Sequence, residues 1–116
     1  MSNRGDVELV RDVREAIVRI RRYLRGMTYR RFLVDTKTQD AVVRNLEVLG
    51  EAVKSISADF RTRHQDVDWK GMAGMRDRLI HQYFGVNLDI VWSVAREKLP
   101  GLRVQMEAIL KGRARR

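Results

Sequence analysis

The segment from residue 76 to residue 85 concentrates the side chains of this sequence that could do acid–base chemistry. It holds two arginines, a carboxylate, an amide, a phenol and one of the two histidines in the chain. A histidine titrates near neutral pH and can act as general base or general acid. An arginine supplies a permanent, fork-shaped cation that pairs well with phosphate oxygens. The segment reads Arg76, Asp77, Arg78, Leu79, Ile80, His81, Gln82, Tyr83, Phe84 and Gly85.

Metal-independent cleavage of RNA is the reaction that fits these groups. The 2′-hydroxyl of RNA attacks its own phosphate, so the substrate supplies the nucleophile. The protein must supply an acid–base group, for which His81 is the candidate, and a cation for the charge that builds on phosphorus oxygens, for which Arg76 is the candidate. The alternative is structural, because Arg, Asp and His on one helix can form a network without any catalytic role.

We expect one helix over residues 68–84, and its geometry sets the relations within the segment. At about 100° per residue, Asp77 shares a face with His81 and could orient its imidazole. Arg76 shares a face with Tyr83, while Arg76 and His81 lie about 140° apart around the axis. Two copies of the chain facing across a two-fold axis could bring both arginines and both histidines into one cleft.

Apolar residues recur at spacings of three and four along most of the chain, which predicts helices and not strands. We expect an all-α fold, a single domain over residues 1–116 built as an up-down bundle of about five helices. Residues 111–116 are basic and are expected to form a disordered tail. The two longest core stripes are Val10, Val13, Ile17, Ile20 and Leu24, and Val42, Leu46, Leu49, Val53 and Ile56.

Polar residues and glycines mark the expected helix boundaries. Residues 57–68 lose the helical period and are expected to form a loop or a short turn of helix. The expected N-caps are Asp6, Thr28, Asp35 or Thr36, Asp68 and Asn87; Pro100 is expected to open the last helix, and Gly26 and Gly85 to end helices.

Three glycines inside helical segments predict close helix contacts, because glycine costs about 1 kcal/mol against alanine in a helix interior. They are Gly50, Gly71 and Gly74. Glu51, next to the first of them, either reaches a cation or is a surface glutamate. His64 has no metal-ligand spacing around it and is expected to be an exposed loop residue.

The charge balance favours a polyanionic partner. Lysine and arginine number 24 against 15 aspartates and glutamates, giving a net charge of +9. RNA or DNA is the partner that such a surface attracts, although many small proteins are basic for no such reason. The arginines at the end of the first helix read as a solvated face, and a dedicated RNA contact is the alternative. The chain has no cysteine and no apolar run long enough for a membrane span. Its first six residues contain no apolar stretch, so we expect no secretory signal, and we expect a cytoplasmic protein without metal or cofactor.

The reactive segment has the form R-X4-H-X-Y and resembles the R-X4-6-H motif of the HEPN superfamily. Other stretches, in the same order along the chain, resemble the HepT toxin branch of that superfamily from about residue 7 to residue 110. These stretches are 40–52, Trp69 ahead of 74–76, 81–85, Trp92 and 99–100. A lone R-X4-H occurs often by chance, whereas the ordered set is specific.

This resemblance implies a ribonuclease toxin of a type II toxin–antitoxin pair that forms a homodimer with a composite cleft. It implies that Arg76 and His81 are catalytic, and that Asp77 supports them where relatives often have asparagine. Tyr83 matches the tyrosine to which a partner antitoxin, a minimal nucleotidyltransferase of the MNT type, adds AMP. The added bulk and negative charge would block RNA. Otherwise Tyr83 packs in the core or at an interface.

The second hypothesis is a HEPN module without catalytic activity that binds nucleotide or a partner nucleotidyltransferase. A DNA-binding helical protein is a weaker third hypothesis, because no helix reads as a base-reading recognition helix. The first two hypotheses differ in whether His81 is needed for RNA cleavage.

Overall fold

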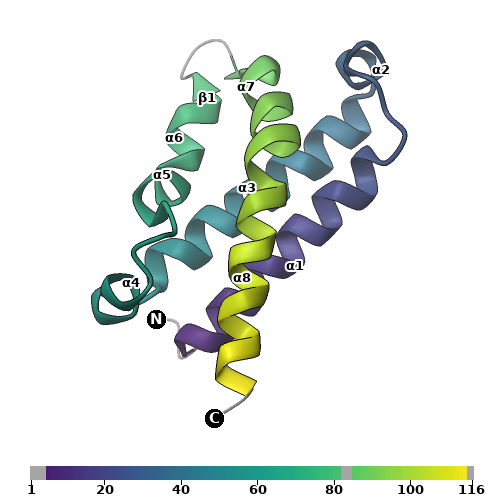
Figure 1. Cartoon of the computed structure of the whole chain (residues 1–116). Helices are drawn as coiled ribbons and strands as arrows, with labels where there is room; N and C mark the ends of the chain where they lie inside the picture. Colours follow the sequence, from purple (N-terminus) through teal and green to yellow (C-terminus); the bar gives the residue numbers. More distant parts are fainter. Residues whose placement is uncertain (1–4, 82–84, 115–116) are drawn as a thin grey trace.

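Two long helices, α1 (Asp6–Leu24) and α3 (Thr36–Ser55), pack against each other and carry the rest of the chain (Figure 1). The computed structural model describes residues 5–81 and 85–114, without the side chains of Arg76, Ile80, His81, Arg113 and Ala114. Every residue of the two predicted core stripes is buried. The fold is all-α, as the apolar period predicted.

Shorter helices close the ends of this pair. Side chains cap the N-terminus of α3 and of four of the short helices. Thr28, Asp35, Asp68 and Asn87 each accept a hydrogen bond from the backbone N–H three residues later, as expected for N-caps. Gly26, with φ of 70°, follows the end of α1 as predicted. The short helices are α2 (Tyr29–Val34), α4 (Ala58–Arg63), α5 (Trp69–Ala73), α6 (Met75–Leu79) and α7 (Leu88–Ser93).

The prediction that Asp6 caps the first helix is wrong. Gly5 occupies the cap position, and Asp6 is the first helical residue. Its carboxylate instead accepts from the backbone N–H and the Oγ of Ser57, both at 2.8 Å. Ser57 in turn caps α4, so the segment predicted as a loop or short turn contains a short helix tied to the start of α1.

The prediction that Pro100 opens a separate helix is also wrong. A π-helical turn, η1 (Val94–Lys98), joins α7 directly to α8 (Leu99–Ala114), so the chain stays helical through Pro100. Proline has no N–H to donate and crowds the preceding turn of an α-helix. The wider π turn, in which the Leu99 N–H donates to the Val94 carbonyl, accommodates it. α8 packs along α1 and stays helical through Ala114, the last residue described.

One of the three helical glycines mediates a close contact. A Cβ added to Gly50 would lie 3.4 Å from the carbonyl oxygen of Met72, so α3 and α5 approach closely there. At Gly71 a Cβ would meet the capping carboxylate of Asp68, and Gly74 lies between α5 and α6 with no neighbouring helix near its missing Cβ. The prediction of helix–helix contacts at Gly71 and Gly74 is therefore wrong.

No helix among the described residues combines the length and the apolar character that crossing a membrane requires.

Candidate functional site

The reactive segment is not one continuous helix. Residues 68–84 were expected to be helical, but the helix breaks at Gly74 and ends at Leu79. His81 then lies on a two-residue strand that pairs with a second one in antiparallel fashion. The strands are β1 (Ile80–His81) and β2 (Gly85–Val86).

A change of hydrogen-bond partner accounts for the end of α6. In a continuing helix the carbonyl of Leu79 would accept from the N–H four residues later. It accepts instead from the N–H of Asn87 at 2.8 Å, and Ile80 pairs with Val86. Gly85, opposite His81, has φ of 75°, a left-handed conformation that favours glycine. It therefore serves the short hairpin and is not the helix C-cap that the sequence suggested.

This geometry removes the helical relations predicted within the motif. Asp77 and His81 are not on one helical face, because the helix ends between them. Tyr83, which was expected to share a helical face with Arg76, lies outside the described residues. The backbone of Arg76 belongs to α6 and that of His81 to β1, so two directly joined elements position the two candidate catalytic residues.

Buried residues on α6 fix the backbone that carries the motif. Met75 and Leu79 are fully buried, and α6 packs against α3 and α7. Asp77 and Arg78, between them, are exposed. The motif thus begins on a helix that packs against the core, while Asp77 and Arg78 face solvent.

A hollow of about 350 Å³ lies next to the hairpin, between α3 and β2. The α3 side contributes Asp40, Arg44 and Glu47, and the opposite side is lined by Val86, the residue that pairs with Ile80. No role was predicted from the sequence for these three α3 residues. Their spacings of four and three place them on one helical face, and this pattern could have predicted that they lie together.

Glu51 continues the same charged face one helical turn further along α3. Its side chain is 69% exposed, and one carboxylate oxygen lies 3.7 Å from the Nζ of Lys54. Glu51 therefore does reach a cation, within its own helix. An exposed pair of this kind contributes little to stability.

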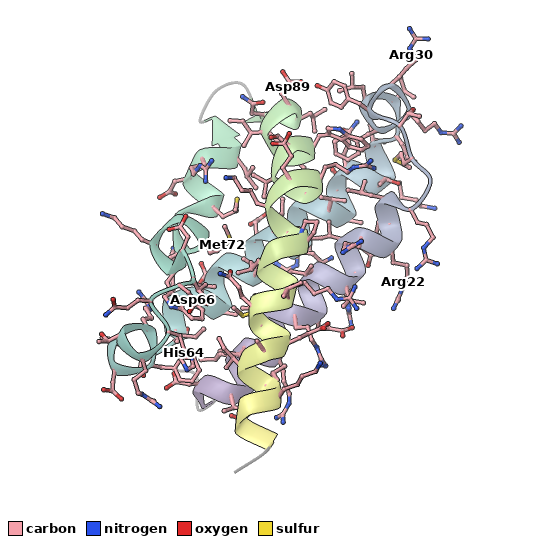
Figure 2. All side chains as sticks on the ribbon, viewed as in Figure 1. Arg22, Arg30, His64, Asp66, Met72 and Asp89 are labelled. Carbon is pink, nitrogen blue, oxygen red and sulfur yellow. The ribbon has the colours of Figure 1, made fainter. Side chains whose placement is uncertain are left out.

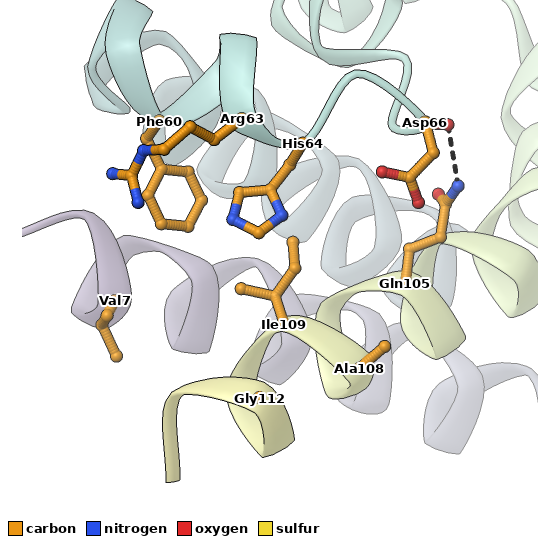
Figure 3. A pocket seen from close by; sticks show the side chains of 9 residues that line it. All are labelled: Val7, Phe60, Arg63, His64, Asp66, Gln105, Ala108, Ile109 and Gly112. Atoms are coloured by element: carbon orange, nitrogen blue, oxygen red, sulfur yellow. Dashed lines mark hydrogen bonds between the residues drawn. The ribbon is translucent and has the colours of Figure 1, made fainter. Parts of the chain in front are cut away.

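The second histidine belongs to a separate apolar pocket of about 230 Å³ between α4 and the end of α8 (Figure 3). His64 is half-buried, not the exposed loop residue expected, and its ring centre lies 4.5 Å from that of Phe60. Its carbonyl accepts from the indole N–H of Trp69 at 2.9 Å. In Figure 3 the His64 ring faces Ile109 across the pocket. These contacts make it a packing residue.

Within residues 5–81 and 85–114, no group of three or more His, Asp or Glu side chains is placed to hold a metal ion.

Comparison with known proteins identifies relatives over most of the chain. The model of the family Ribonuclease HepT-like matches residues 13–109. The chain is 46% identical over 100 residues to a "Putative RNase" of Methanocaldococcus jannaschii, covering 86% of this chain and 83% of that protein. It is 42% identical over 108 residues to the "Probable ribonuclease HepT" of Thermococcus cleftensis, covering 93% and 98%. No solved structure matches the chain.

Proposed function

Because the chain belongs to the Ribonuclease HepT-like family, we propose that it is a metal-independent endoribonuclease in which Arg76 and His81 act on the scissile phosphate. This proposal rests mainly on one observation: the R-X4-H-X-Y segment lies inside the range that the family model matches, residues 13–109. The names of the relatives, "Putative RNase" and "Probable ribonuclease HepT", and the net charge of +9 support RNA as the substrate class.

The proposed reaction uses the RNA's own 2′-hydroxyl. The imidazole of His81 takes the hydroxyl proton as the 2′-oxygen forms a bond to phosphorus. The bond from phosphorus to the 5′-oxygen breaks, and a protonated imidazole gives that oxygen a proton. The guanidinium of Arg76 stabilises the charge on the non-bridging oxygens. The products are a 2′,3′-cyclic phosphate and a 5′-hydroxyl end.

We further propose that two copies of the chain form a homodimer whose motifs share one cleft. A two-fold axis presents the same patch twice, so one cleft would hold two copies of each catalytic group. Asp77, exposed beside Arg76, and Glu51 would act as supporting residues near this cleft.

In this proposal the chain is a toxin that acts in the cytoplasm. Its antitoxin is a minimal nucleotidyltransferase, which inhibits it by adding AMP. The phenol oxygen of Tyr83 would attack the α-phosphorus of ATP, forming an O–P bond and releasing pyrophosphate. The attached AMP adds a negative charge and bulk two residues from His81, which would exclude RNA. The mass increase of one AMP on the wild-type chain, absent from Tyr83→Phe, tests this step.

The experiment that tests the ribonuclease compares wild type with His81→Ala and Arg76→Ala on end-labelled RNA in EDTA. We expect His81→Ala to slow cleavage on the order of 10²- to 10⁴-fold, as for loss of a general acid–base group. The wild-type products should carry 2′,3′-cyclic phosphate ends. If wild type and His81→Ala are equally inactive on RNA while the chain still binds nucleotide or a nucleotidyltransferase, it is a non-catalytic module.

Mixed dimers test the shared cleft. When Arg76→Ala and His81→Ala chains are combined, a heterodimer retains one arginine and one histidine in its cleft. We expect it to cleave RNA faster than either parent homodimer. No recovery in a purified heterodimer would contradict a cleft built from both subunits.

A further inference from the structure

A groove lined by five arginines lies where the end of α1 meets η1 and the first turn of α8. Its volume is about 570 Å³, and no carboxylate is among the described residues that line it, although Glu107 pairs with Arg103. The arginines are Arg21, Arg22 and Arg25 from the α1 side, and Arg96 and Arg103 from the opposite side. The groove is separate from the hollow beside the motif hairpin, with which it shares no lining residue.

These cations come from two separate helical segments. The stability of each helix taken alone does not explain why they lie together. Arginines in the last turn of α1 interact favourably with the helix dipole. That effect gives no reason for Arg96 and Arg103 to face them from another part of the chain. Like charges brought together raise the electrostatic energy, and a bound anion would lower it.

The two cations on the η1–α8 side are held in place by their neighbours. The guanidinium carbon of Arg96 lies 5.1 Å from the ring centre of Trp92, a cation–π contact. The Nε of Arg103 donates to Glu107 at 2.9 Å. That hydrogen bond is the main reason why the pKa of Glu107 lies below its usual range.

The cations on the α1 side remain available. Arg21, Arg22 and Arg25 are exposed, and none of them forms an ion pair within the described part of the chain. Arg22 projects outward from the end of α1 (Figure 2). The groove thus combines two fixed guanidinium groups with three that can adjust to a ligand.

We propose that this arginine groove binds the phosphate backbone of single-stranded RNA and guides the substrate of the ribonuclease proposed above, on which the inference rests. Five guanidinium groups along one groove match a row of phosphates better than a single small anion. Arginine also stacks on bases, which favours an unpaired strand.

The test measures binding of a fluorescein-labelled oligo(U) RNA by anisotropy over a range of salt, in a His81→Ala background that cannot cleave it. The groove variant carries Arg21→Gln, Arg25→Gln and Arg96→Gln. Loss of three phosphate contacts should make the slope of log K against log salt less negative by about 2. At about 0.1 M salt the RNA should bind on the order of 10²-fold more weakly.

The matched control removes the same charge elsewhere, at exposed positions outside the groove: Arg11→Gln, Lys37→Gln and Lys111→Gln. It should keep nearly the wild-type slope. A groove variant with lysine at its three positions should keep most of the binding, which separates charge from folding. Equal binding by the groove variant and the control would overturn the proposal.

The outcomes also separate this inference from the proposed catalysis. If RNA binding depends on the groove but no His81-dependent cleavage exists, the groove stands and the ribonuclease does not. If cleavage depends on His81 and the groove variant binds and cleaves like wild type, only the groove is wrong. In an active enzyme the groove variant should raise KM with kcat little changed.

Discussion

The carboxylate of Asp6 receives two hydrogen bonds from Ser57, one from its backbone N–H and one from its Oγ, each at 2.8 Å. The residues are 51 positions apart in the chain, so these bonds join the first turn of α1 to the cap of α4. They tie the long helix pair to the segment that leads into α5 and the motif.

We expect Asp6→Ala to lower the free energy of unfolding by about 1–2 kcal/mol, because two hydrogen bonds to a charged acceptor are lost. Glu8→Ala is the control, since Glu8 is the other acid in the first turn and interacts equally with the helix dipole. Urea denaturation of both variants measures the difference. Equal losses would show that the dipole, and not the bonds to Ser57, accounts for the effect.

The contact between Gly50 and Met72 predicts a size limit at the point where α3 meets α5. Gly50→Ala should change the free energy of unfolding by less than about 1 kcal/mol, because gained helix propensity offsets a 3.4 Å approach to a backbone oxygen. Gly50→Leu should destabilise by about 1–3 kcal/mol, since its side chain cannot fit without moving α5. Thermal denaturation compares the two. A stable Gly50→Leu protein would mean that this packing is loose.

The helices and their caps were predictable because their causes are local. The apolar residues of α1 and α3 repeat at helical spacing, and Thr28 or Asn87 can satisfy only the N–H groups just after it. The close approach at Gly50 was also predictable, because a buried glycine within a long helix has few other uses.

Two of the errors, at the cap of α1 and at the end of α6, arose where a residue outside the helix decides the outcome. Asp6 does not cap α1, because its carboxylate accepts hydrogen bonds from Ser57 instead. The helix α6 does not continue, because the backbone N–H of Asn87 donates to the carbonyl of Leu79. The residues from 75 to 81 keep a helical pattern of apolar residues, so no local signal marks the end of the helix. The motif was found from residue types and order, but its geometry required the fold.

The pH dependence of stability should contain a contribution from Asp35. Hydrogen bonds from the backbone N–H and then the Oγ–H of Thr38 hold the pKa of this carboxyl below its usual value. A pKa lowered by folding stabilises the protein above the unfolded-state pKa, which is about 3.9 for aspartate. That stabilisation is lost as the pH falls through the folded-state pKa.

The variant Asp35→Asn removes the titrating group while keeping a capping side chain. We expect the stability difference between wild type and variant to be larger at pH 7 than below the unfolded-state pKa. Urea denaturation at several pH values measures this difference. A gap that stays constant with pH would show that ionisation of Asp35 does not contribute.

Two glycines with nearly the same left-handed backbone offer a test of whether the hairpin positions His81, the histidine proposed to be catalytic. Gly85 has φ of 75° opposite His81, and Gly26 has φ of 70° after α1. At both positions, no described residue beyond the adjacent ones has an atom within 4 Å of where a Cβ would lie. Alanine at either position should cost about 1–2 kcal/mol of stability through backbone strain alone.

The two variants should differ in RNA cleavage at a temperature where both are folded. Gly85→Ala strains the strand that pairs with His81, and a small displacement of a catalytic group can cost on the order of 10²-fold in rate. Gly26→Ala should cleave like wild type, because its strain lies in the connection between α1 and α2. Equal rates for both variants, with equal losses of stability, would mean that the pairing of Gly85 with His81 does not set the geometry of the reaction.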